Sequence, residues 1–216
     1  MMNKQKTIYT GARSEIIEKK SRFISTTSPL VSEEEAINFI TGVKKEHYNA
    51  THNCYAYCLG ERDEIMRCSD DGEPSGTAGK PILNVLLGRE LHNIAIVVTR
   101  YFGGILLGTG GLVRAYSKAA EEGINQSIII TKRYAIRVYL VTDYSEIGKI
   151  QYLLANQELT TVDTRYTDVV TLELLVPIEQ VGEMEYEITE LTNGKTLIRK
   201  GEEVYFAIVN NHVEIF

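Results

Sequence analysis

Glycine, hydroxyl and basic side chains gather in the stretch TRYFGGILLGTGGLVRAYSKAA, which runs from residue 99 to residue 120. An apolar, strand-like segment leads into its glycines, and a helix-like segment follows them. Backbone N–H groups at a helix start are free to bind an anion, and glycines let a phosphate approach them closely. We therefore predict an anion- or nucleic-acid-contacting surface made of Arg100, Tyr101, Gly103, Gly104, Gly108, Thr109, Gly110, Gly111, Arg114 and Lys118.

These glycines match neither of the two common phosphate-binding motifs. The run from Gly108 to Gly111 lacks the third glycine of a dinucleotide-binding fingerprint, and no P-loop lysine follows it. A glycine-rich turn that only allows close packing is the alternative. We expect Gly110 to need backbone angles that valine does not tolerate, so that Gly110→Val would damage the loop.

A second cluster, SDDGEPSGTAGKP, begins at residue 69 and combines hydroxyls, carboxylates and a lysine. Ser75 and Thr77 are candidate helix N-caps with Lys80 in the first turn, which is a second place for an anion. It is not a P-loop, because Pro81 follows the lysine where Ser or Thr is required. Oxygen ligands suit Mg²⁺, and the carboxylates here are Asp70, Asp71 and Glu73. The alternative is a turn that only caps a helix.

A third cluster, THNCYAY, contains His52 and Cys54, and Cys58 follows it. The two cysteines share one strand face, but at 3.3 Å per residue they lie about 13 Å apart. One zinc ion cannot bind both unless the strand bends. The spacing therefore favours buried thiols that act as small hydrophobes, and we assign only His52 to the predicted binding surface.

Hydrophobic spacing predicts the elements that position these clusters. Ser32 followed by Glu35 forms a capping box before apolar residues at helical spacing, so a helix is expected to start there. The run IAIVV from Ile94 is typical of a strand that is buried on both faces. The other elements predicted in this half are strands at 8–17, 22–27, 52–59 and 65–68 and helices at 79–87 and 112–125.

Residues 131–216 show a different order of elements and none of these motifs. Their alternating and helical patterns predict the order β-α-β-β-α-β, with the last strand at 204–209. This is the split βαβ order of a ferredoxin-like domain. We therefore predict a protein of the α+β class with two domains, residues 1–130 and residues 131–216.

The charge distribution also separates the two halves. Residues 1–130 carry equal numbers of acidic and basic residues, so the net charge of −6 belongs to residues 131–216. Within the neutral half, residues 77–118 hold five basic residues against Glu90 alone. This pattern indicates a local basic region in a protein whose whole surface would not attract nucleic acid. Scattered, solvated charge is the alternative.

Composition excludes several classes of protein. The chain has 216 residues, 44% of them hydrophobic, and its apolar runs are far shorter than the roughly 20 residues that a membrane span needs. Three cysteines crowded into residues 54–68 do not suit a secreted disulfide scaffold and fit a reducing compartment. We expect a cytoplasmic protein without a membrane segment.

Four stretches of the first half resemble the YigZ/IMPACT family of bacterial and eukaryotic proteins. They are KKSRFIS (19–25), ATHNCYAY (50–57), DDGEPSGTAGKPIL (70–83) and VVTRYFGGILLGTGGLVRAYSKA (97–119). Together they cover the three clusters described above, which belong to the family's UPF0029 domain. The residues after 130 are similar to its second bacterial domain, DUF1949, and the domain order matches that of the bacterial members.

This resemblance implies both a fold and a field of action. The first domain is expected to be similar to domain 2 of ribosomal protein S5. The second is expected to be ferredoxin-like and similar to domain V of elongation factor G. The eukaryotic relative acts in translational control by competing for the activator of a stress kinase, a system that bacteria lack. The resemblance therefore implies a regulator or accessory factor of translation and leaves its bacterial partner open.

We predict a non-enzymatic, translation-linked factor that binds RNA, the ribosome or a translation protein and needs no cofactor. Its contact surface would combine the basic and glycine residues near residue 100 with His52, Ser75, Thr77 and Lys80. Replacing Arg100 or Arg114 by alanine would then weaken binding and leave the fold intact.

Two other functions fit parts of the sequence. One is a nucleotide- or phosphate-binding enzyme that resembles the homoserine, galactokinase and mevalonate kinases, whose phosphate loop also opens a helix. Asp70 or Asp71 would then hold Mg²⁺, but the paired serines of that group are missing and the chain is short for it. The other is a protein–protein adaptor whose acidic second domain docks a basic partner.

Overall fold

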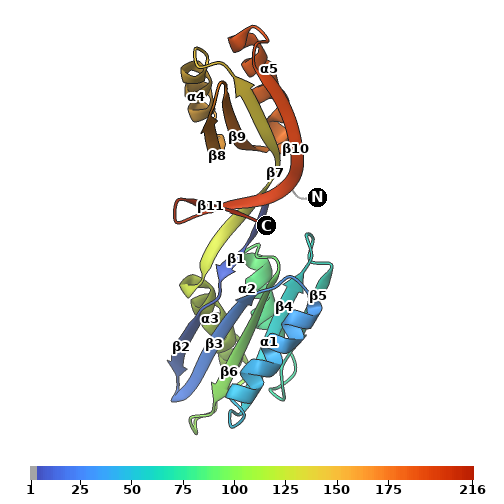
Figure 1. Ribbon diagram of the computed structural model, residues 1–216. Helices are drawn as coiled ribbons and strands as arrows, with labels where there is room; N and C mark the ends of the chain where they lie inside the picture. The colour runs from blue at the N-terminus through green and yellow to red at the C-terminus, as the bar shows by residue number, and fades with distance from the viewer. Residues whose placement is uncertain (1–3) are drawn as a thin grey trace. The chain divides into compact units, whose positions relative to one another are not determined.

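The computed structural model describes residues 4–216, and the chain divides into two compact units (Figure 1). One unit comprises residues 5–131, and the other includes residues 132–216. Each unit joins helices to an antiparallel sheet. This arrangement confirms the predicted α+β class.

The first unit is built on a five-stranded antiparallel sheet. In spatial order its strands are β2 (Arg13–Glu18), β3 (Ser21–Pro29), β6 (Ile94–Tyr101), β4 (His52–Leu59) and β5 (Ile65–Ser69). The central strand β6 is buried along nearly its whole length. The IAIVV run therefore forms the predicted strand that is covered on both faces.

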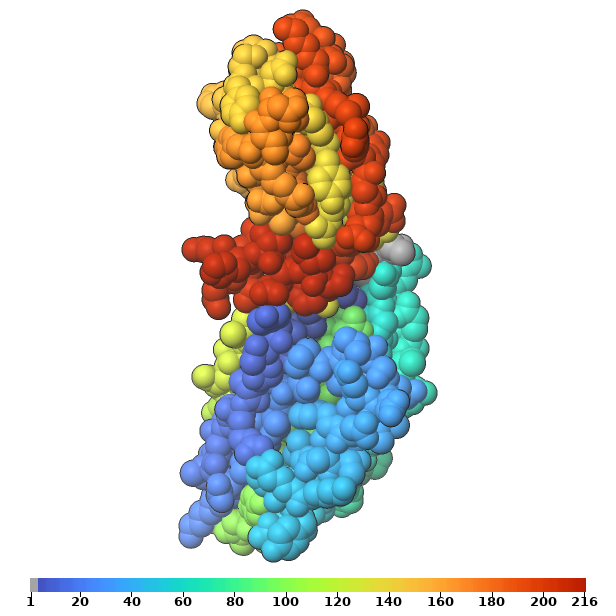
Figure 2. Space-filling model, in the orientation of Figure 1, coloured from blue at the N-terminus to red at the C-terminus, as the bar shows by residue number. Residues whose placement is uncertain are grey.

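Helices cover the two faces of this sheet, as Figures 1 and 2 show for α1 on the near face. α1 (Glu33–Glu46) packs on Ala95 and Val97 of β6. α2 (Gly79–Gly88) and α3 (Thr109–Gln126) belong to the core on the other side. The strand residues Cys54, Cys58, Ile94, Ile96 and Val98 point into that second core. The alternation along β6 divides its side chains between the two layers.

The start of α1 confirms the predicted cap in part. Ser32 is the N-cap, and its Oγ accepts a hydrogen bond from the N–H of Glu35 at 3.2 Å. In a full capping box the Glu35 carboxylate would accept from the N–H of Ser32. Here it accepts from the N–H of Val31 instead, at 2.9 Å.

The predicted strand at 8–17 is two strands, because the chain bends at Gly11. β1 (Lys4–Thr10) pairs with β7 (Ile128–Thr142), whereas β2 joins the main sheet. The Ala12 N–H donates to Thr27 Oγ1 at 2.8 Å, and the Thr27 N–H donates to the Ala12 oxygen at 3.0 Å. A Cβ at Gly11 would lie 2.0 Å from the Thr27 oxygen, so only glycine fits this approach.

The second unit has the predicted ferredoxin-like order. Its elements are β7, α4 (Ile147–Asn156), β8 (Thr160–Tyr166), β9 (Val170–Pro177), the short 3₁₀ turn η1 (Ile178–Gln180), α5 (Val181–Thr192), β10 (Leu197–Val209) and β11 (His212–Ile215). The strands lie in the order β11-β10-β7-β9-β8. One shared core holds Val138 and Leu140 of β7, Ile150 of α4, and Met184 and Ile188 of α5.

Two features of this unit differ from the sequence prediction. β10 begins at Leu197, whereas the predicted strand begins at 204. β11 was not predicted and pairs with β10 through a hairpin whose turn residues, Asn210 and Asn211, both have positive φ. Asparagine tolerates these angles, which the tightest hairpin turns require.

The capping geometry makes a testable prediction for the stability of the first unit. Ser32→Ala removes the Oγ acceptor at the start of α1, so the free energy of unfolding should fall by about 1 kcal/mol. Ser75→Ala is the matched control, because Ser75 is exposed and makes no side-chain hydrogen bond within residues 4–216. Urea denaturation followed by circular dichroism measures both variants. Equal midpoints for the two variants would contradict the role of Ser32.

Candidate functional site

One pocket of the first unit is lined by residues from all three sequence clusters. Its volume is about 430 Å³, and we call it the His52 pocket. His52 comes from the cluster THNCYAY, and Glu73 and Pro74 come from the cluster SDDGEPSGTAGKP. The glycine-rich cluster contributes the remaining residues named here. These residues are Arg100, Gly108 and Thr109 and the apolar residues Phe102, Leu106, Leu107 and Leu112. The fold therefore brings distant motifs together around one cavity.

A buried ion pair lies at this pocket. The Arg100 guanidinium donates through Nη1 to the Glu73 carboxylate at 2.6 Å, and the two residues are only 5% and 8% exposed. The Tyr116 hydroxyl of α3 donates to the same carboxylate oxygen at 2.8 Å. The Phe23 and Phe102 rings each lie 5.4 Å from the guanidinium carbon of Arg100. The carboxylate and the two rings thus enclose the positive charge.

This environment changes the expectation for Arg100. The sequence predicts a basic side chain whose removal leaves the fold intact, but its charge is already neutralised by Glu73. Truncation would leave a buried carboxylate without its counter-charge, which is strongly destabilising in other proteins. Arg100 therefore belongs to the framework of the pocket, not to an exposed basic surface.

His52 has a defined orientation in the pocket. Its Nδ1 lies 2.8 Å from the carbonyl oxygen of Asp71, which can only accept a hydrogen bond. The carbonyl partner therefore places a proton on Nδ1, and in that tautomer Nε2 is the nitrogen that can accept a hydrogen bond. This Nε2 is 3.8 Å from the Glu73 carboxylate, and His52 is half-buried.

The three carboxylates that were candidates for a cation each have separate partners. Asp70 accepts from backbone N–H groups at the start of α2, and Asp71 accepts from Lys44 Nζ at 2.6 Å and from the Asn53 N–H at 2.7 Å. Glu73 is held by Arg100. Among residues 4–216, no group of three His, Cys, Asp or Glu side chains has the geometry to hold a metal ion. The structure therefore does not bring these carboxylates together as a ligand set.

Asp70 takes the capping role that the sequence suggested for Ser75 and Thr77. Its carboxylate accepts from the N–H groups of Gly76, Ala78 and Gly79 at 2.8 to 2.9 Å. Burial acts to raise the pKa of Asp70, but these three N–H groups outweigh it and hold the pKa below its ordinary value. Thr77 instead donates its hydroxyl to the Pro74 oxygen at 2.6 Å.

The glycine loop divides into positions that need glycine and one that does not. Gly104 and Gly108 have φ of +84° and +72°, which side chains rarely adopt. A Cβ at Gly103 would lie 2.1 Å from the backbone of Lys20. Gly110 has ordinary angles and open space around it, because α3 begins at Thr109 and includes it. The expectation that Gly110 needs unusual backbone angles is therefore wrong.

The exposed basic residues lie outside the His52 pocket. Arg114 and Lys118 line a smaller pocket of about 240 Å³ together with Lys19, Glu18 and Gly111. Lys80 lies in another, on α2 and α3, where Arg89 is also found. Tyr101 bonds through its hydroxyl to His47 and Asn49. The predicted binding residues are thus distributed over three places on one unit.

The cysteines of β4 are buried thiols, as predicted. Cys54 Sγ donates to the Asp70 oxygen at 3.0 Å, and Cys58 Sγ donates to the Leu91 oxygen at 3.1 Å. Burial raises the pKa of each thiol to about 12. Both side chains therefore stay protonated and act as packing groups at neutral pH.

Comparison with known proteins gives a consistent picture. Two family models match, the "Impact N-terminal domain" over residues 19–124 and the "Domain of unknown function (DUF1949)" over residues 140–195. These matches agree with the S5 domain 2-like and ferredoxin-like folds that the resemblance implies. In residues 4–216, no helix is long and apolar enough to cross a bilayer.

Bacterial relatives cover most of the chain, whereas the human relative covers less than half of it. The "IMPACT family member YvyE" of Bacillus subtilis is 42% identical over 214 residues, or 99% of each chain. The "IMPACT family member YigZ" of Escherichia coli is 36% identical over 86% of this chain and 92% of that protein. Human "Protein IMPACT" is 33% identical over 43% of this chain and 30% of its own length. A solved structure titled "Crystal structure of an hypothetical protein" has a TM-score of 0.60 and 33% identity over 94% of this chain and 99% of that one.

The ion pair makes a prediction for stability. Arg100→Met should lower the free energy of unfolding by about 3–5 kcal/mol, because it leaves the Glu73 carboxylate buried and unpaired. The double variant Arg100→Met/Glu73→Gln should recover part of that loss, since no buried charge remains. Arg114→Met, the same change at an exposed position, should stay within about 0.5 kcal/mol of the parent. Urea denaturation measures all three variants. A loss of less than about 1 kcal/mol in Arg100→Met would contradict the structural role of the buried ion pair.

The Asp70 cap makes a prediction for pH dependence. Asp70→Asn should lower stability by about 1–2 kcal/mol at pH 7, the range for a weakened helix cap. Because the folded pKa is depressed, this stabilisation is complete above the unfolded value of about 4 and is lost as pH falls through the folded pKa. Thermal melts at pH 7 and at about pH 3 should therefore show a gap between parent and variant that narrows in acid. A difference in melting temperature that widens in acid would exclude a capping role for the ionised Asp70 carboxylate.

Proposed function

This chain belongs to the IMPACT family, and from that premise we propose that it is a translation-linked factor that binds RNA through exposed basic residues beside the glycine loop. The family resemblance supports a role in translational regulation. In this proposal residues 1–130 form the RNA-binding domain and residues 131–216 a second, acidic domain. The proposed site of action is the cytoplasm.

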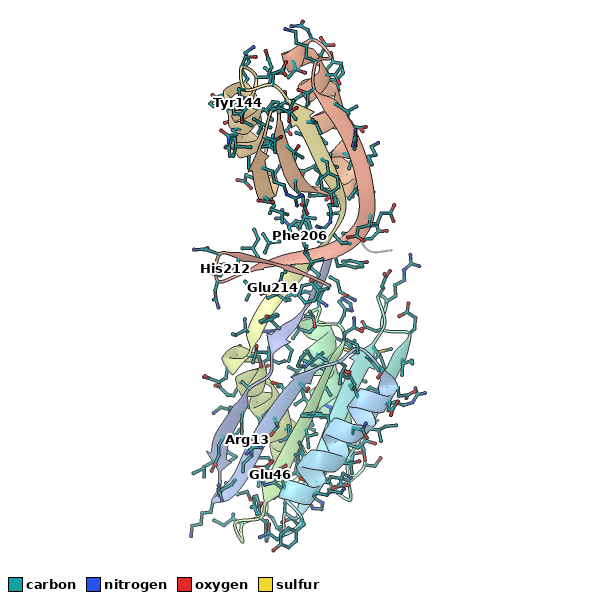
Figure 3. All side chains as sticks on the ribbon, in the orientation of Figure 1. Arg13, Glu46, Tyr144, Phe206, His212 and Glu214 are labelled. Atoms are coloured by element: carbon teal, nitrogen blue, oxygen red, sulfur yellow. The ribbon has the colours of Figure 1, made fainter. Side chains whose placement is uncertain are left out.

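The observation that carries the proposal is the set of basic residues left without an acidic partner. The exposed residues Lys19, Lys20, Lys80, Arg114 and Lys118 make no ion pair within residues 4–216. Two exposed arginines elsewhere in the same unit are neutralised, whereas Lys45, Arg62 and Arg89 are also exposed and make no ion pair within residues 4–216. Arg13 pairs with Glu46 at 2.7 Å (Figure 3), and Arg22 pairs with Glu15 at 2.7 Å. Among the unpaired cations, Lys19, Arg114 and Lys118 lie together in one pocket that Gly111 of the glycine loop also lines.

The position of these charges suits a phosphate backbone. Arg114 and Lys118 lie one turn apart on α3 and line one pocket with Lys19, and Glu18 is the acidic residue there. Several fixed cations on one face can contact successive phosphates of a strand. Phe102 is 46% exposed beside this loop, so a base can stack on its ring. The acidic second domain would limit indiscriminate binding.

The proposal predicts salt-dependent RNA binding. A labelled single-stranded RNA of about 12 nucleotides should bind with an affinity that falls steeply as salt rises. Arg114→Glu/Lys118→Glu should weaken it at least tenfold. It should also reduce the slope of log affinity against log salt by about 1.4, since each lost contact to a single strand contributes about 0.7. Fluorescence anisotropy at several salt concentrations gives both quantities.

The control is Lys45→Glu/Arg62→Glu, which reverses the same number of charges at exposed positions distant in sequence from the glycine loop. It should bind RNA with nearly the parent's slope. Equal losses of RNA affinity in both double variants would show that only net charge matters. That result would overturn the proposed binding surface. Failure of the parent to bind RNA, with a nuclease-resistant partner in pull-downs, would favour the adaptor hypothesis instead.

A further inference from the structure

We propose that the His52 pocket binds a small organic phosphate, with the phosphate at the start of α3 and an apolar body against the pocket wall. This site differs from the basic residues of the RNA proposal and does not rest on it. Arg114 and Lys118 do not line the pocket. The proposal depends on the cavity, on the free backbone N–H groups at the start of α3 and on the buried Nε donor of Arg100.

The cavity has the size and lining of a ligand site. Its volume of about 430 Å³ falls within the range of small-molecule pockets, which combine apolar walls with a few converging polar groups. Phe102 and Leu106 form part of the wall and are 46% and 81% exposed. An apolar ligand body would remove these side chains from water, which is favourable in proportion to the area covered.

The start of α3 reaches the pocket through Gly108 and Thr109, which line it, and has unused donors there. The helix is 18 residues long, and its N-cap Gly108 offers no side-chain acceptor. No acceptor in residues 4–216 contacts the N–H groups of Thr109, Gly110 and Gly111. Free N–H groups at the positive end of a helix dipole suit a phosphate, whose several oxygens can accept from them together.

Glycines leave the backbone bare at this point. A Cβ added at Gly108 or Gly110 would meet nothing within 4 Å. Gly108 lines the pocket, and Gly110 follows the lining residue Thr109. Gly110 has ordinary helical angles, and glycine there weakens the helix relative to alanine. Packing and backbone geometry therefore give no reason for this glycine. Access of a ligand to the bare N–H groups gives one.

The buried end of the pocket supplies a second, independent indication. Arg100 lines the pocket and is 5% exposed, and its Nε is buried without a hydrogen-bond partner in residues 4–216. An unpaired buried donor is costly, and a ligand oxygen that enters the pocket can act as its acceptor. His52 Nε2 lies at the same end and can accept from a ligand hydroxyl.

The test uses phenyl phosphate, which joins a phosphate to an aromatic ring, with inorganic phosphate and phenol as its separate parts. Titration of ¹⁵N-labelled full-length protein should show saturable shifts of the Thr109, Gly110 and Gly111 amide signals with phenyl phosphate. Each separate part should bind at least tenfold more weakly. Equal affinity for inorganic phosphate would overturn the role of the apolar wall. No saturable shift with any of the three would overturn the site.

Thr109→Pro and Thr109→Ala form a matched pair. Proline is well tolerated at the first helical position, and the ψ of 167° at Gly108 suits a residue before proline, so both variants should fold. Proline removes one N–H donor and should weaken phenyl phosphate binding at least tenfold, whereas alanine keeps that donor and should bind within about threefold of the parent. Equal binding by both variants would overturn the placement of the phosphate.

Two further variants separate this site from the RNA surface. Leu106→Ala, at an exposed position, should weaken phenyl phosphate binding several-fold and leave inorganic phosphate unaffected. Arg114→Glu/Lys118→Glu should bind phenyl phosphate within about threefold of the parent's affinity, although it binds RNA at least tenfold more weakly. If that variant lost affinity for both ligands to the same degree, the claim that the pocket is separate from the RNA surface would be overturned. Loss of RNA binding alone would leave the pocket standing.

Discussion

The buried ion pair between Arg100 and Glu73 is the interaction on which the first unit's pocket depends. It joins the end of β6 to the segment that precedes α2, and the Tyr116 hydroxyl adds α3 to the same carboxylate. Removing two charges from water is costly, and good geometry with further hydrogen bonds is needed to offset that cost. The 2.6 Å contact and the tyrosine donor supply both. The three elements must therefore keep their positions for either charge to remain buried.

The acidic cluster stabilises the same region through its other two carboxylates. Asp70 caps α2 from a position nine residues before Gly79, and Asp71 joins Lys44 of α1 to the backbone of β4. Three carboxylates within four residues of one turn thus bind to five elements, the strands β4 and β6 and the helices α1, α2 and α3. A run of carboxylates that resembles a cation site in the sequence is, in this fold, a set of structural acceptors.

Local patterns predicted the elements well, and long-range contacts account for most of the differences. Apolar periodicity identified β6, and the Ser32 acceptor identified the start of α1, because both signals lie within a few residues. The bend at Gly11 depends on Thr27, and the Asp70 cap depends on a turn that folds back over its own chain. The pairing of Arg100 with Glu73 spans 27 residues, so charge counting along the chain could not show that this arginine is neutralised.

The same comparison indicates where function should be sought in this unit. Arg100, Asp70, Asp71 and most glycines of the loop have structural reasons for their type, in partners or in backbone angles. Gly110 has no such reason, and Arg114 and Lys118 have no acidic partner within the described residues. A residue that the fold does not require is informative, because glycine in a helix and unpaired exposed charge bring the fold no stability of their own. The loop between β6 and α3 therefore joins a rigid, neutralised framework to a small number of groups that remain free for a ligand.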